Sequence, residues 1–94
     1  MASTLGKAVL TVVGKDTVGI IAKICTFLSD HEINILDISQ TIVSDYFNMI
    51  MIIDLSKTTT SFEHVQDGLA EIGEGLGVDI KCQREEIFEM MHRI

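Results

Sequence analysis

Two segments in which nearly every residue is apolar constrain the fold of this chain most. Residues 7–13 (KAVLTVV) and 46–55 (YFNMIMIIDL) are rich in β-branched and other large apolar residues at consecutive positions. Such segments are typical of strands that are buried on both faces in the middle of a sheet. We therefore expect both to be central strands, and any further strand to lie at an edge.

The segment after the first of these strands combines a short loop with an amphipathic helix. Gly14 and Gly19 bound the loop, and a helix is expected over residues 19–31. Asp16 or Thr17 is expected to cap the helix, because a carboxylate or hydroxyl can accept a hydrogen bond from a free backbone N–H. The helix's apolar residues recur at helical spacing and predict one face for a sheet: Ile20, Ile21, Ile24, Phe27 and Leu28.

The rest of the chain alternates between strand and helix patterns. Residues 33–44 read as a strand that ends in a hairpin turn at Ser44 and Asp45, and residues 78–83 alternate strictly, as a half-exposed strand does. Between them, Thr60 and Glu63 have the spacing of a capping box and predict the start of a second helix. Its apolar stripe consists of Phe62, Val65, Leu69, Ile72 and Leu76, and the glycines expected to end it are Gly73, Gly75 and Gly77.

The predicted order is βαββαβ with an additional helix over residues 85–94. This is the ferredoxin-like arrangement of the α+β class, in which two helices cover one face of an antiparallel sheet. The chain length fits one domain, 1–94, with its core at about 7–83. The opposite sheet face is expected to be apolar and to include Met49, Ile50 and Met51. The C-terminal helix, a partner subunit or both would then cover it.

Composition limits the partners of the chain. Its net charge of −7 repels phosphate backbones, so direct nucleic-acid binding is not expected. No apolar run is long enough to cross a bilayer and no leader pattern opens the chain, which predicts a cytoplasmic protein without membrane contact. Cys25 and Cys82 lie in apolar patterns and are expected to be buried thiols, although a disulfide between them stays open.

No set of residues at a diagnostic spacing predicts catalysis or metal binding. Cys25 and His31 are more than one helical turn apart, so a nucleophile pair is not expected. His31, His64 and His92 are far apart in sequence and lack the spacing of metal ligands. The sequence therefore predicts no enzyme, no metal and no cofactor.

The loop between Gly14 and Gly19 allows two interpretations. As a binding site, its backbone N–H groups from Thr17 to Ile20 would accept a carboxylate at the helix N-terminus, and Asp16 and Asn34 would address an ammonium group. Since Asn34 begins the next strand, at the other end of the helix, a ligand that touches both would bridge two subunits. As a simple turn, the loop would only connect a strand to a helix, and residue spacing alone favours this.

The run VVGKDTVGIIAKI, followed by INILDISQ, resembles the ACT domain, a regulatory module that binds small molecules. The resemblance extends from about Lys7 to the C-terminal IFEMMHRI. It is strongest to the small stand-alone ACT proteins of bacteria and archaea, relatives of the repressor-like group of the glycine cleavage system. Members of this family typically form dimers that bind amino acids or similar ligands between the first loop and the start of the second strand, and the resemblance implies the same for this chain.

Carried over to this chain, Asp16, Gly19 and Asn34 match the ligand-contacting pattern, and Val18 stands where many members have Pro. The predicted ligand-binding residues are Asp16, Thr17, Val18, Gly19, Ile20, Asn34 and Ile35. The leading hypothesis is a homodimeric regulatory protein that senses an amino-acid-like effector and acts through a protein partner. The alternative is a module for protein interaction or dimerisation that binds no ligand.

Overall fold

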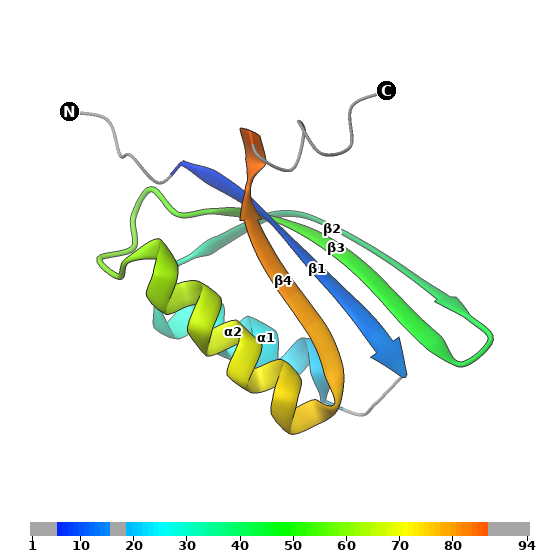
Figure 1. Ribbon diagram of the computed structural model, residues 1–94. Coiled ribbons are helices and arrows are strands. Elements are labelled where there is room, and N and C mark those ends of the chain that lie inside the picture. The colour runs from blue at the N-terminus through cyan, green and yellow to red at the C-terminus, as the bar shows by residue number, and fades with distance from the viewer. Residues whose placement is uncertain (1–5, 16–18, 87–94) are drawn as a thin grey trace.

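The computed structural model describes residues 6–15 and 19–86 of the chain (Figure 1). The elements in these ranges are β1 (Lys7–Lys15), α1 (Ile20–Asp30), β2 (Asn34–Val43), β3 (Tyr46–Asp54), α2 (Phe62–Leu76) and β4 (Val78–Arg84). The strands form an antiparallel sheet in the order β2-β3-β1-β4. Both helices lie on the same side of it (Figure 1). The ferredoxin-like βαββαβ fold and the central position of the two apolar segments are therefore confirmed.

The core lies between the helices and the sheet. Directly paired residues of neighbouring strands point to the same face, and every second residue of β1, β3 and β4 points toward α1 and α2. The buried strand residues on this face are Ala8, Leu10, Val12, Phe47, Met49, Met51, Ile53, Val78, Ile80 and Cys82. The helices add Ile20, Ile24, Leu28, Val65 and Leu69, and Ile33 and Leu55 complete the cluster.

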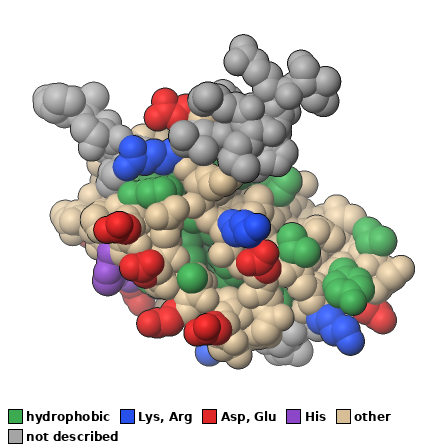
Figure 2. Space-filling model, viewed as in Figure 1, with side chains coloured by type: hydrophobic (Ala, Val, Ile, Leu, Met, Phe, Trp, Pro, Cys, Tyr) green, Lys and Arg blue, Asp and Glu red, His purple; other side chains and the backbone are tan. Residues whose placement is uncertain are grey.

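The prediction for the second sheet face was wrong in part. Met49 and Met51 are 1% and 0% exposed in the core, because both alternate with Ile50 along β3. Ile50 does lie on the open face, where it is 46% exposed, and so do the 47% exposed Val13 and the 49% exposed Tyr46. Figure 2 shows hydrophobic side chains on the side of the molecule where the β2–β3 hairpin ends. The open face thus carries an apolar patch at one end. What covers it stays a prediction.

The N-cap residues of both helices differ from those expected from sequence. The N-cap of α1 is Gly19, whose φ of 93° is left-handed, and not Asp16 or Thr17 as predicted; the side chains of these two lie outside the described residues. In α2 the N-cap is Ser61, whose hydroxyl oxygen accepts a 3.1 Å hydrogen bond from the backbone N–H of His64, so Thr60 is not the cap. The C-cap of α2 is Gly77.

Two of the three glycines expected to end α2 lie inside it. Gly73 and Gly75 are helical, and only Gly77 takes the left-handed geometry, with a φ of 75°. The expected hairpin turn is confirmed: Ser44 and Asp45 both have positive φ, 47° and 73°, as a two-residue turn between antiparallel strands requires. Of the predicted C-terminal helix over residues 85–94, only Glu85 and Glu86 belong to the described residues, and both are helical.

The edge strand β2 differs from the other strands in its exposure. All of its residues except Ile35 are exposed, including Leu36, Ile38, Ile42 and Val43. An irregularity in the register between Ile35 and Asp37 places one extra residue in β2 opposite β3. Leu36 has no partner on β3, and such a bulge interrupts the alternation of faces along β2 at this residue.

Candidate functional site

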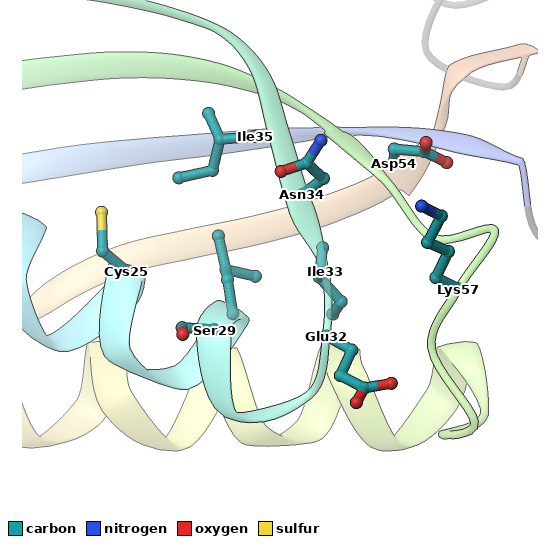
Figure 3. Close-up of a pocket in the computed structure, with 9 residues that line it drawn as sticks. Cys25, Ser29, Glu32, Ile33, Asn34, Ile35, Asp54 and Lys57 are labelled. Carbon is teal, nitrogen blue, oxygen red and sulfur yellow. The ribbon is translucent and has the colours of Figure 1, made fainter.

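An open cavity of about 700 Å³ lies between the C-terminal half of α1, the start of β2 and the chain that leaves β3 (Figure 3). Its lining residues come from three parts of the sequence that the fold brings together: Cys25, Leu28, Ser29, Glu32, Ile33, Asn34, Ile35, Asp54 and Lys57. Since β2 forms the edge of the sheet, no strand lies beyond it in the described part of the chain. One side of the cavity is therefore left open to a second molecule.

Local structure places each group around the cavity. Cys25 and Ser29 are four residues apart in α1 and so lie on the same side of the helix. After α1 the chain turns at Glu32, whose φ is 58°, and Ile33 is buried as β2 begins. Asn34 is paired directly with Asp54 at the end of β3. In Figure 3, Asn34, Asp54 and Lys57 lie near one another, whereas Cys25 and Ser29 line the α1 side.

The cavity offers charges of both signs. The backbone N–H of Ser56 donates a 2.9 Å hydrogen bond to Asp54 Oδ1. This bond, with a second one from the Ser56 side chain and the nearby positive charge of Lys57, lowers the pKa of Asp54. Asp54 is thus a carboxylate at neutral pH, with the ammonium of Lys57 on the same wall. Leu28, Ile33 and Ile35 supply an apolar wall. Such a set can hold a small zwitterion that also carries an apolar group.

The structure brings together only part of the predicted site. Asn34 and Ile35 line the cavity, while Gly19 and Ile20 lie at the opposite end of α1, an eleven-residue helix that spans about 16 Å. Ile20 is 2% exposed in the core, so only its backbone could meet a ligand. Asp16, Thr17 and Val18 lie outside the described residues. As expected, Asn34 and Gly19, where the loop ends, lie at opposite ends of α1 within one subunit.

Comparison with known proteins assigns the fold to a family. The ACT domain family matches residues 7–83. The chain belongs to the ACT domain family. A UPF0237 protein of Bifidobacterium longum is 56% identical over 90 residues, which cover 96% of this chain and 100% of that protein. A UPF0237 protein of Clostridium acetobutylicum is 54% identical over 94% of this chain and 99% of its own length. This ACT domain is therefore a member of the UPF0237 group.

Solved structures agree with this assignment. An ACT domain protein from Streptococcus pneumoniae is 36% identical, with a TM-score of 0.78, over 92% of this chain and 97% of its own. A putative glycine cleavage system transcriptional repressor matches with a TM-score of 0.75 at 22% identity, over 87% of this chain and 47% of its own. The second likeness concerns the fold alone, and it places the repressor-like ACT proteins among the structural neighbours.

Sequence reasoning missed most of the cavity of this ACT domain. Ser29, Glu32, Asp54 and Lys57 were not among its predicted site residues. Asp54 could have been found from the hairpin, because a two-residue turn at Ser44 and Asp45 fixes which end of β3 meets the start of β2. Because β2 contains a bulge, counting residues back from the turn gives the partner of Asn34 on β3 only to within one residue.

The two cysteines differ in their surroundings, and both are free. Burial raises the pKa of the Cys82 thiol to about 12, which makes it unreactive at neutral pH. Cys25 is only half-buried and lines the cavity, so the prediction of burial was right for Cys82 and wrong for Cys25.

Of the helices in the described part of the chain, neither α1 nor α2 is long and apolar enough to cross a membrane.

Proposed function

We propose that this ACT domain is a non-catalytic, cytoplasmic sensor that binds an amino-acid-like ligand between two copies of the chain and acts through a protein partner. The observation that carries the proposal is the cavity beside Asn34, which holds a carboxylate and an ammonium side chain and is open along the sheet edge. The family resemblance supports it, since ACT domains typically bind small effectors.

Charge complementarity suggests how the ligand would lie. Asp54 and Glu32 would attract its ammonium group, Lys57 and the Asn34 amide would bind its carboxylate, and an apolar side chain would contact Ile33 and Ile35. The second copy would add the loop that ends at Gly19, with the predicted contacts from Asp16, Thr17, Val18 and Ile20. Free N–H groups at a helix N-terminus favour a carboxylate.

The exposed β2 strand supports pairing of two copies edge to edge. An unpaired edge of this length, with exposed Leu36, Ile38, Ile42 and Val43, is an association surface unless it is covered. In antiparallel pairing of two β2 strands, the Asn34 end of one copy meets the Val43 end of the other. Because α1 and β2 run in opposite directions, this end also lies toward the N-terminus of the partner's α1. The edge-to-edge arrangement would therefore bring the two halves of the composite site together.

Isothermal titration with each amino acid at millimolar concentration tests the site. We expect Asn34→Ala, Asp54→Asn and Asp16→Ala each to weaken binding about tenfold or more, since a hydrogen bond to a charged group contributes about 1.5–3 kcal/mol. Asp79→Asn is the matched control: it removes a carboxylate that is 66% exposed on β4, away from the cavity. Binding that is lost in the control, or kept in all three site variants, would contradict the proposal.

The second candidate is an interaction module that binds no ligand, which the exposed apolar side chains of β2 favour by themselves. Light scattering on size-exclusion eluate separates the two. A dimer that is disrupted by Ile42→Asp, together with no heat from any amino acid, would support the module. A monomer at micromolar concentration would contradict both candidates.

A further inference from the structure

Two histidines that are far apart in sequence meet at one end of the helical layer. His31 is the C-cap residue of α1, and His64 lies in the first turn of α2. The centroids of their rings are 5.6 Å apart, with an angle of 49° between the planes. Sequence spacing gave no sign of this pair, because it arises only when the two helices pack side by side on the sheet.

The ring of His31 is held in one orientation. Its Nδ1 lies 2.8 Å from the backbone oxygen of Phe27, and the ring contacts the Phe27 ring at a centroid distance of 4.3 Å. A carbonyl oxygen can only accept, so Nδ1 carries the proton and Nε2 keeps its lone pair when the imidazole is neutral. Metal-binding histidines commonly show this same Nδ1–H bond to a backbone oxygen, which fixes both tautomer and direction.

The separation of the rings suits one shared metal ion. Zinc binds histidine nitrogen at about 2.0–2.1 Å, and two imidazoles at a tetrahedral angle then have ring centres about 5 Å apart. The observed centroid distance of 5.6 Å is close to this value, and the exposed side chain of His64 is free to rotate. No third Asp, Glu, His or Cys completes a cluster in the parts of the chain that the structure describes. Water would fill the remaining positions of an open site.

The surrounding charge favours a cation. Helix α2 (FEHVQDGLAEIGEGL) contains four acidic residues and no Lys or Arg. Figure 2 shows histidine beside acidic side chains at the end of the molecule where α2 begins. With a net charge of −7 for the whole chain, this surface raises the local concentration of divalent ions.

We propose that His31 and His64 form a binding site for a borderline divalent transition metal ion, with Zn²⁺ as the probe. A bound ion would link the C-terminus of α1 to the first turn of α2. Glu32, Ile33 and Asn34, which follow His31 directly, line the cavity described above. Metal binding would therefore fix the segment by which the chain enters that cavity. The site is independent of the proposed effector and stands if no amino acid binds.

The test is titration of metal-free protein with ZnCl₂, followed by calorimetry and by thermal unfolding. We expect one ion per chain, a higher unfolding temperature with Zn²⁺, and loss of more than tenfold in affinity in His31→Gln and in His64→Gln. Glu74→Gln and Asp79→Asn are the controls, because both carboxylates are exposed near the C-terminal end of α2, away from His64 in its first turn. Both variants should bind as the unchanged chain does. If His31→Gln does not fold, the exposed His64 carries the test alone.

The proposal is overturned if no Zn²⁺ binds at neutral pH, if His64→Gln binds as tightly as the unchanged chain, or if either control loses the ion.

Discussion

Gly73 and Gly75 occupy the same helix, α2, and differ in what a side chain would meet there. A Cβ at Gly75 has no atom within 4 Å, whereas a Cβ at Gly73 would lie 2.7 Å from the backbone oxygen of Val78 and 3.1 Å from Ile80 Cγ1. Gly75→Ala therefore changes only helix propensity and the entropy of the unfolded chain. Gly73→Ala adds a clash with backbone, which cannot rotate away as the end of a side chain can.

The magnitudes follow from these two terms. Glycine in a helix costs up to about 1 kcal/mol relative to alanine. Because Gly75 lies next to the last helical residue, Gly75→Ala should stabilise the folded chain by about half of that, about 0.5 kcal/mol. Gly73→Ala gains a similar amount but pays about 1–3 kcal/mol for overpacking. We expect Gly75→Ala to exceed Gly73→Ala in free energy of unfolding by about 1–3 kcal/mol.

Urea unfolding at a fixed protein concentration, followed by far-ultraviolet circular dichroism, measures the difference. The midpoints should rank Gly75→Ala above the unchanged chain and Gly73→Ala below it, with equal slopes. The concentration is held constant because association would shift the apparent stability. Equal midpoints for the two variants would refute the packing argument, and a lower midpoint for Gly75→Ala would refute the propensity argument.

Two further predictions concern the hairpin and the thiols. Asp45 has a φ of 73° in the turn between β2 and β3, so Asp45→Gly should stabilise by about 1 kcal/mol in the same urea assay, and a lower midpoint would contradict the turn geometry. With a thiol reagent at pH 8, half-buried Cys25 should react quickly and Cys82, with its pKa near 12, only after unfolding. Two fast thiols in the native protein would show that the β4 side of the core is not closed.

The fold could be predicted because its signals are local and agree with one another. Two nearly apolar segments identify β1 and β3 as central strands, and helical periodicity over 19–31 and from Phe62 to Leu76 identifies α1 and α2. Handedness of the crossovers then fixes the strand order. Sequence reasoning chose wrongly where two neighbouring residues could serve as the cap. Thr60 and Ser61 are adjacent and both carry a hydroxyl group, and it is Ser61 that caps α2.

The cavity and the histidine pair could not be predicted in the same way, because they depend on contacts between distant segments. Asp54 meets Asn34 only through the register of the hairpin, and that register contains a bulge near Leu36. His31 meets His64 only through the packing of α1 beside α2. Sequence reasoning included Asn34 and Ile35 among the site residues, and it missed the charged residues Glu32, Asp54 and Lys57.

The edge position of the cavity links ligand binding to assembly. The described lining residues enclose the cavity on the α1 and β3 sides, and the remaining side is the exposed edge at β2. If a second copy closes that side, a ligand binds more tightly to the dimer than to the single chain. By linkage, the ligand must then strengthen dimerisation by the same factor per bound site. An effector would thus act on a partner protein by changing the population of dimers, without any large change within the ACT fold itself.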